Sequence, residues 1–155
     1  RVGCQFAGDG DWGIDNLNEK PNWMSFLPDW MWAYDYPNNI NNEGIEIVNS
    51  IFPDYNHKLA NPVYPTPFYE TIMSFILFAI MWGLRKMIKF SGILFSLYVF
   101  FTGAERLLIE RIRVNVEYGN GLTQAEIISM ILIGLGIAGM IFFYLKGKKK
   151  AQTTY

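Results

Sequence analysis

The sequence predicts an all-α multi-pass membrane protein, with three transmembrane helices preceded by an aromatic- and proline-rich interfacial region. Of its 155 residues, 51% are hydrophobic, and long apolar stretches appear only after residue 67. Charge divides in the same way. Residues 1–70 hold ten acidic and three basic side chains, whereas residues 71–155 hold four acidic and ten basic ones. We therefore expect two environments, 1–67 and 68–150, followed by a short tail, 151–155.

The three apolar stretches are each close to the roughly 20 residues that cross a bilayer core. They are Phe68–Leu84, a stretch that starts near Gly92 and runs GILFSLYVFFTGAERLLIERI, and Ala125–Leu145. The first and third are apolar on all sides, which excludes a one-sided surface helix. The third contains Gly134 and Ala138, a small-xxx-small pair suited to close helix contact, although glycine is also common in membrane helices generally.

Basic residues orient these stretches. Cytoplasmic loops carry an excess of lysine and arginine. The loop after the first stretch and the segment after the third are both basic, so we place that loop and the C-terminus in the cytoplasm. Three crossings then leave Asn61–Pro67 and Tyr118–Gln124 on the outer side. The basic residues are Arg85, Lys86, Lys89, Lys146, Lys148, Lys149 and Lys150.

The first 67 residues are rich in turns. All seven prolines lie between Pro21 and Pro67, and short strands are expected around Ile45–Val48. The segment Trp23–Pro37 is dense in tryptophan and tyrosine. Such rings prefer the headgroup level of a membrane, and the alternative is a core or ligand groove of a soluble domain.

The segment Gly8–Gly13 matches the pattern G-x-G-x-x-G. A dinucleotide fingerprint requires a preceding strand and a following helix. Here a turn-rich segment follows, and Asp9 and Asp11 would repel a pyrophosphate. The two aspartates also begin like a calcium loop, but Gly13 stands where the third ligand should be and no glutamate closes the loop.

Other site classes are also disfavoured. Cys4 and His57 are the only cysteine and histidine, so no metal-ligand set is present. We expect His57, in a polar loop, to be solvated. The basic residues form short clusters between apolar runs, which does not indicate a nucleic-acid surface.

The second apolar stretch carries charges at its outer half. On a helix, Arg106, Glu110 and Arg113 would share one face, and the first two have the spacing of an ion pair. A charge within a membrane span costs about 2.5–3.5 kcal/mol, so we expect these side chains to face a polar site. The alternative is that the helix ends near Leu107 and a charged outer loop follows.

Polar residues also open the other two stretches. Glu70 lies near the head of the first one, where a carboxylate favours a helix N-terminus or could act in catalysis. Gln124 opens the third stretch and could cap its helix or contact a ligand headgroup.

Four stretches resemble motifs of the prolipoprotein diacylglyceryl transferase family, in the family's order and at about its spacing. RVGCQFAGDGDWG is similar to the signature G-R-x-G-N-x-x-N-G-E-x-W-G, and VYPTPFYE is similar to H-P-x-Q-L-Y-E. GAERLLIERIRVN resembles G-x-x-R-x-x-x-E-x-x-R, and GLTQAEIISM resembles x-x-Q-x-x-S. Any one match is weak, but the four together are specific and cover nearly the whole chain.

The resemblance implies an enzyme of the bacterial inner membrane, whose outer side is the periplasm. It would transfer the diacylglyceryl group of phosphatidylglycerol to the lipobox cysteine of a prolipoprotein signal peptide. A thioether forms and glycerol 1-phosphate leaves, with no metal or cofactor. The chain starts inside the signature, at Arg1, so we expect a fragment that is inactive without a preceding half.

The resemblance also assigns roles. Arg1, Arg106 and Glu110 match the residues expected to be catalytic, with the arginines contacting the lipid phosphate and Glu110 holding Arg106. The matches that imply substrate binding are Arg1, Asp9, Asp11, Gly13, Tyr69, Glu70, Arg113 and Gln124. The nucleophilic thiol belongs to the substrate and is not that of Cys4.

The chain departs from the family pattern at several positions. Cys4 replaces asparagine, Tyr64 replaces histidine and Pro67 replaces glutamine. The signature is one residue longer, so its acid is Asp9 or Asp11. These departures leave open a non-catalytic lipid- or partner-binding protein on the same scaffold. A small transport component is disfavoured because the sequence contains no internal repeat.

Overall fold

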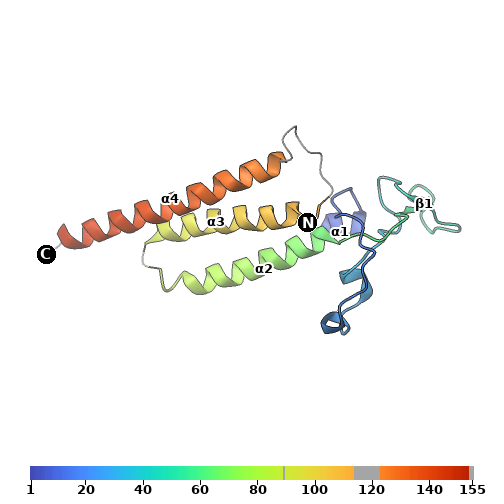
Figure 1. The fold of residues 1–155 in the computed structure, drawn as a ribbon, viewed down its shortest axis with the longest axis horizontal. Helices are drawn as coiled ribbons and strands as arrows, with labels where there is room; N and C mark the ends of the chain where they lie inside the picture. The colour runs from blue at the N-terminus through green and yellow to red at the C-terminus, as the bar shows by residue number, and fades with distance from the viewer. Residues whose placement is uncertain (89, 114–122, 154–155) are drawn as a thin grey trace. The chain divides into compact units, whose positions relative to one another are not determined.

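The computed structural model describes residues 1–88, 90–113 and 123–153, and Figure 1 shows its elements along the chain. The chain divides into two compact units. The first comprises Arg1–Ile72 with Arg111–Val114, and the second comprises Met73–Glu110 with Asn115–Tyr155. Most of the predicted outer loop Tyr118–Gln124 lies outside the described residues.

Three long helices among the described residues confirm the predicted fold class. They are α2 (Thr66–Leu84), α3 (Ser91–Glu110) and α4 (Gln124–Thr153). Each contains a segment long and apolar enough to cross a membrane, and these segments are Thr66–Leu84, Gly92–Glu110 and Gln124–Lys149. The end of α3 at Glu110 lies between the two predicted alternatives, so Arg113 is not on the helical face that the spacing predicted.

In the second unit, α3 and α4 pack along each other, as Figure 1 shows. Glycines allow the close approach. A Cβ on Gly136 would lie 2.7 Å from the Cβ of Phe100, and one on Gly103 would lie 2.9 Å from the carbonyl oxygen of Ser129. Ser96 and Ser129 are buried at the interface. Each hydroxyl donates a hydrogen bond to a carbonyl one turn earlier in its own helix, which satisfies it within the apolar contact.

The predicted small-residue pair does not form this contact. A Cβ on Gly134 would meet nothing within 4 Å, and Gly134 and Ala138 are both exposed. The interface falls instead on Gly136 and Gly139 because helical periodicity places these residues on another side of α4.

The first unit is mostly irregular. It begins with α1 (Val2–Ala7) and continues through the 3₁₀ turns η1 (Asn22–Met24) and η2 (Asp29–Met31). Strands β1 (Ile45–Glu46) and β2 (His57–Lys58) pair antiparallel, with Ile45 opposite Lys58. The short strand expected around Ile45–Val48 is therefore confirmed.

A small core holds the first unit together. It consists of Trp12, Tyr36 and Val63, with Tyr34 and Leu59 packed against it. Trp12 and Tyr36 have ring centroids 5.4 Å apart. The backbone of Val63 pairs with both Asp15 and Tyr34, so the segment before α2 joins the beginning of the chain to the aromatic segment.

The aromatic segment Trp23–Pro37 divides into two parts. Trp23 and Phe26 are exposed, at 72% and 78%, whereas Tyr36 is 2% exposed in the core. Trp30 lies between them and stacks edge-on against Phe68 in the first turn of α2, with centroids 5.0 Å apart. The core alternative thus holds for the end of the segment, and its beginning presents its rings outward.

His57 is not the solvated side chain that its polar neighbours predicted. Its Nδ1 is buried and has no hydrogen-bond partner among the described residues. His57 lies in β2 and is half-buried, because this strand pairs with β1 rather than remaining in an open loop.

Candidate functional site

Four of the predicted site residues gather in the first unit. Arg1 precedes α1, Asp11 follows the turn that Gly8 and Gly10 create, and Glu70 lies in the second turn of α2. Arg113 comes from the segment that follows α3. We call Arg1, Asp11, Glu70 and Arg113 the charge cluster.

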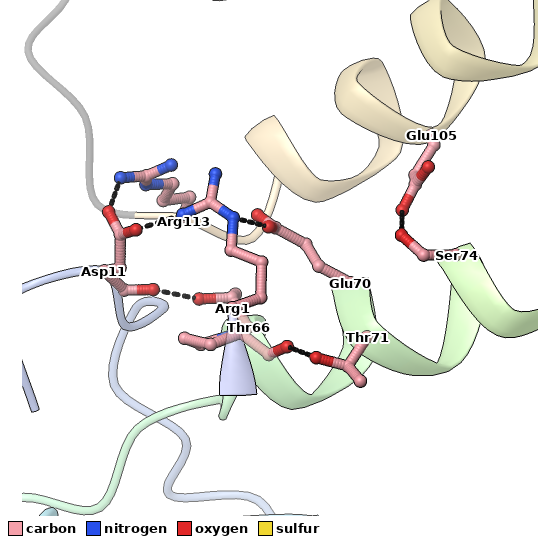
Figure 2. Close-up of polar contacts among 9 residues, drawn as sticks. Arg1, Asp11, Thr66, Glu70, Thr71, Ser74, Glu105 and Arg113 are labelled. Carbon is pink, nitrogen blue, oxygen red and sulfur yellow. Dashed lines mark hydrogen bonds and ion pairs between the residues drawn. The ribbon is translucent and has the colours of Figure 1, made fainter. Parts of the chain in front are cut away.

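The carboxylate of Asp11 lies between two guanidinium groups, as Figure 2 shows. Arg1 Nη1 donates to Asp11 Oδ2, and Arg113 Nη2 donates to Asp11 Oδ1. Arg1 Nε also forms an ion pair with Glu70 Oε2. The cluster therefore alternates in sign and connects four separate segments of the chain.

The backbone at Asp11 is also held. The hydroxyl of Thr66 donates a hydrogen bond to the carbonyl oxygen of Asp11 at 2.5 Å, and Thr66 is fully buried. No motif in the sequence singled out Thr66 for this contact. It links the first residue of α2 to the glycine-rich segment.

The cluster is partly open to solvent. The side chains of Arg1 and Glu70 are 39% and 14% exposed, and those of Asp11 and Arg113 are each 22% exposed. Partial burial lowers the pKa of Arg1, but attraction by Glu70 and then Asp11 outweighs it, so that the pKa is raised. Arg1 therefore remains charged. Each of the two guanidinium groups has five N–H donors, more than these contacts use.

The surroundings of Gly13 show why this position, at the end of the signature, requires glycine. Its backbone pairs with Arg113 in an isolated β-bridge, and its N–H donates to the carbonyl oxygen of Tyr64 at 2.9 Å. A Cβ at this position would lie 2.6 Å from the carbonyl oxygen of Ile112. Only glycine allows the backbone on both sides to approach this closely.

Tyr69 also lies in the first unit, and its hydroxyl makes a hydrogen bond to the backbone. It donates a hydrogen bond to the carbonyl oxygen of Met31 at 2.9 Å. This contact ties the end of η2 to the first turns of α2, so Tyr69 positions part of the aromatic segment.

Asp9 is separate from the charge cluster in its contacts. It is exposed and accepts a hydrogen bond from the thiol of Cys4. This hydrogen bond, followed by burial, raises the pKa of Cys4 above its ordinary 9.0. Of the two candidate acids, Asp11 is thus the one that the structure pairs with arginines.

Ligand atoms of Cys4, Asp9 and Asp11 lie within 4.8 Å of one another, so we tested whether they fit a metal ion. They do not fit one. The thiol of Cys4 is held protonated by Asp9, whereas a metal requires the thiolate. Both oxygens of Asp11 already accept hydrogen bonds from guanidinium groups.

Arg106, Glu110 and Gln124 belong to the second unit. Arg106 is exposed and Glu110 is buried. The expected ion pair between them is not formed in the described part of the chain. Glu110 Oε1 instead accepts a hydrogen bond from Thr123 Oγ1 at 2.5 Å, because the buried carboxyl group turns toward the start of α4.

Thr123, rather than Gln124, caps α4. The N–H of Glu126 donates to Thr123 Oγ1 at 3.2 Å, and the N–H of Thr123 donates to Glu126 Oε2 at 3.0 Å. This reciprocal pair is a capping box, and the pattern Thr-x-x-Glu in the sequence would have identified it. Gln124 is exposed.

Comparisons with known proteins identify the family of this chain. The family model described as prolipoprotein diacylglyceryl transferase matches residues 1–142. The phosphatidylglycerol–prolipoprotein diacylglyceryl transferase of Dehalococcoides mccartyi strain 195 is 36% identical over 92 residues, which cover 59% of this chain and 35% of that protein. The enzyme of the same name from Buchnera aphidicola (strain Tuc7) is 30% identical over 152 residues, covering 92% of this chain and 52% of that protein.

A third relative is the enzyme of that name from Clostridium tetani, 37% identical over 97 residues, which cover 61% of this chain and 36% of that protein. The chain thus spans between about a third and half of the length of these relatives. No solved structure matches the chain significantly. Since the family model covers almost the whole sequence, including every residue of the charge cluster, the chain belongs to the prolipoprotein diacylglyceryl transferase family.

Proposed function

We propose that this protein transfers the diacylglyceryl group of phosphatidylglycerol to the lipobox cysteine of prolipoprotein signal peptides. The thiol sulfur forms a thioether bond to the glyceryl carbon, and the bond from that carbon to the phosphate oxygen breaks. Glycerol 1-phosphate leaves. The observation that carries this proposal is the charge cluster, in which Asp11 holds Arg1 and Arg113 together.

The chemistry requires fixed cations at a phosphate. The leaving group gains negative charge as the bond breaks, and preorganised donors directed at that charge lower the barrier. Arg1 and Arg113 are planar, always charged and suited to bidentate phosphate contact. Asp11 and Glu70 hold them in place before the substrate arrives, so the guanidinium groups need little reorganisation.

The nucleophile comes from the substrate. Cys4 is a poor candidate, because its raised pKa keeps the thiol protonated at neutral pH, and the thiolate is the reactive form. From the family resemblance we further propose that Arg106 also contacts the lipid phosphate and that Gly13, Tyr69 and Gln124 contribute to substrate binding.

The protein would act in the bacterial inner membrane. We propose that residues 1–67 face the periplasm, residues 68–150 form the membrane region and residues 151–155 belong to a cytoplasmic tail. The basic residues after the first and third spans support this orientation. The partners are then phosphatidylglycerol and the signal peptide, and no nucleic acid is involved.

The test is an assay of the protein expressed from its complete coding sequence, with phosphatidylglycerol vesicles and a lipobox peptide. We expect a diacylglyceryl-modified peptide, and expect Arg1→Ala and Arg106→Ala each to reduce its formation. Full activity in both variants would contradict the phosphate-contact role of these arginines.

A second candidate function is a non-catalytic lipid- or partner-binding protein. It is favoured by Cys4 and Tyr64, which stand where the family pattern has asparagine and histidine. In this structure the ring of Tyr64 stacks against Trp32, with centroids 5.6 Å apart. Complementation of bacteria depleted of their own transferase separates the two, since rescue of growth would eliminate the non-catalytic candidate.

A further inference from the structure

The hydroxyl of Thr66 is directed away from its own helix. Thr66 is the first residue of α2 and is 0% exposed. Its hydroxyl donates a hydrogen bond to the carbonyl oxygen of Asp11 at 2.5 Å, and Figure 2 shows this contact beside the two arginines that Asp11 holds. A buried hydroxyl without a partner costs free energy, so this hydrogen bond holds the two residues together.

The contact is not needed to cap α2. The first four N–H groups of a helix have no partner within it, and a threonine at this place often accepts from one of them. Here the N–H of Thr66 donates to the carbonyl oxygen of Tyr64 at 2.8 Å. The next residue is a proline without an N–H, and the two residues after it donate to the carbonyl oxygen of Pro65 at 3.0 and 3.2 Å. Backbone atoms therefore satisfy the start of the helix, which leaves the hydroxyl for Asp11.

The segment that begins α2 holds the chain around Asp11 at two points. Gly8 and Gly10, which precede Asp11, have φ values of 62° and 93°, and a glycine turn restrains its neighbours weakly because glycine is so flexible. After Asp11, the N–H of Gly13 donates to the carbonyl oxygen of Tyr64 at 2.9 Å. The Thr66 hydroxyl is the other point, and it fixes the peptide group that follows Asp11.

The local sequence presents this hydroxyl in a fixed direction. Thr66 lies between Pro65 and Pro67, and all three side chains are fully buried. Proline fixes its own φ, and it restricts the residue before it. Threonine is also branched at Cβ, which restricts χ1. Little conformational freedom is therefore lost when Thr66 binds the backbone of Asp11.

We infer that Thr66 is a positioning residue for the proposed transfer reaction. Both carboxylate oxygens of Asp11 accept from guanidinium groups, one from Arg1 and one from Arg113. By fixing the backbone of Asp11, Thr66 fixes where these cations are held, and it does so without contacting the substrate. A displacement of about 1 Å in a reacting group can reduce a rate about a hundredfold. The catalytic consequence rests on the proposed function, whereas the effect on the arginines does not.

The first experiment measures kcat of the full-length protein with a lipobox peptide and phosphatidylglycerol vesicles. Thr66→Val keeps the shape of the side chain but removes the hydroxyl, and we expect kcat to fall about tenfold. Thr66→Ser restores the hydroxyl and should retain most of the wild-type rate. Thr71→Val is the matched control, because the Thr71 hydroxyl donates to the carbonyl oxygen of Pro67 at 2.7 Å, and it should keep the wild-type rate.

A double-mutant cycle separates positioning from a general structural role. If Thr66 acts through the carboxylate of Asp11, then Thr66→Val should change kcat about twofold or less in an Asp11→Asn protein, because interacting residues are not additive. A tenfold loss in both backgrounds would overturn the positioning role.

A second readout does not require the reaction. Phenylglyoxal modifies guanidinium groups, and mass spectrometry gives its rate at each arginine. We expect Thr66→Val to raise the rates at Arg1 and Arg113 about twofold or more, since their charge-assisted hydrogen bonds hold them at Asp11. Arg85, which is exposed in the segment after α2, is the internal reference and should not change.

Unchanged rates at both arginines in the folded variant would overturn the positioning role. If the wild type transferred no diacylglyceryl group, the proposed function would fail, and the phenylglyoxal rates would still decide whether Thr66 fixes the arginines. Thr66→Ala also lacks the hydroxyl and serves as the second variant should Thr66→Val not fold. Unfolding of both would assign Thr66 to the stability of the first unit alone and overturn the inference.

Discussion

Asp11 accepts a hydrogen bond from Arg113, which lies 102 positions further along the chain. The other oxygen of the same carboxylate accepts from Arg1. One aspartate thus joins the beginning of the chain to the segment that follows α3. This relationship distinguishes Asp11 from Asp9, which the sequence left as equal candidates.

Asp11→Asn should lower both stability and transfer activity. An amide cannot accept two charge-assisted hydrogen bonds in the way that a carboxylate can, so we expect a loss of about 1–3 kcal/mol in the free energy of unfolding. We also expect transfer activity to fall by about tenfold or more, because the arginines lose their shared anchor. Denaturant unfolding and the lipobox-peptide assay measure the two effects. Asp9→Asn is the matched control, and equal effects of both substitutions would argue against the special position of Asp11.

Gly13→Ala should destabilise the first unit. The added Cβ would lie 2.6 Å from the carbonyl oxygen of Ile112, and the bridge to Arg113 would have to open. We expect a loss of about 1–3 kcal/mol, measured by thermal unfolding in detergent. The control is Gly3→Ala in α1, where a Cβ meets nothing within 4 Å and alanine favours the helix. A stable Gly13→Ala protein would mean that this close approach does not occur.

Thr123→Val should weaken the start of α4. Valine has the same shape but lacks the oxygen that caps the helix and contacts Glu110, so we expect a loss of about 1–2 kcal/mol. Hydrogen exchange in the first turn of α4 should increase accordingly. The comparison variant is Thr71→Val, whose hydroxyl, among the described residues, donates a hydrogen bond to a carbonyl of its own helix alone. Unchanged exchange in Thr123→Val would show that the capping box is not formed in solution.

Gly136→Ala should disturb the contact between α3 and α4, because its Cβ would lie 2.7 Å from the Cβ of Phe100. We expect a loss of about 1–3 kcal/mol, seen as a lower thermal midpoint. Gly134 lies two positions before Gly136, and a Cβ there would meet nothing within 4 Å. Gly134→Ala should therefore leave the thermal midpoint unchanged or raise it. If Gly134→Ala lowered the thermal midpoint and Gly136→Ala did not, the interface would instead involve Gly134 and Ala138.

The reactivity of Cys4 should depend on pH in a specific way. The hydrogen bond to Asp9, followed by burial, raises the pKa of the thiol above 9.0, so folding favours the neutral form. This contribution to stability is present below pH 9 and is lost as the pH rises through the higher pKa of the folded state. Maleimide labelling of the folded protein should therefore require a higher pH than labelling of the unfolded chain. Asp9→Asn should move the two pH profiles together, and identical profiles before this substitution would contradict the contact.

The sequence predicted the helices well and the contacts between residues far apart poorly. Three spans were expected, and the residues that the structure describes contain three helices long and apolar enough to cross a membrane, because length and hydropathy are local properties of each stretch. The spacing of Arg106, Glu110 and Arg113 predicted one charged helical face. That prediction was wrong because α3 ends at Glu110 and Arg113 turns away to pair with Gly13 and Asp11.

Other contacts differ in how far they could be predicted from the neighbouring sequence. The capping box of Thr123 and Glu126 follows a local pattern and could have been predicted. The bond from Thr66 to the backbone of Asp11 could not, since no local pattern connects residues 55 positions apart. The resemblance to the family named all four members of the charge cluster, but it did not indicate how they are paired.

The sequence by itself determined the class of protein, the number of spans and the family, because these depend on composition and on motifs that are continuous along the chain. Only the tertiary structure decided which acid holds the arginines, why position 13 requires glycine and which glycines lie between α3 and α4. The physical reason is that ion pairs, close backbone approaches and grooves depend on distances between segments, which hydropathy and motif spacing do not encode.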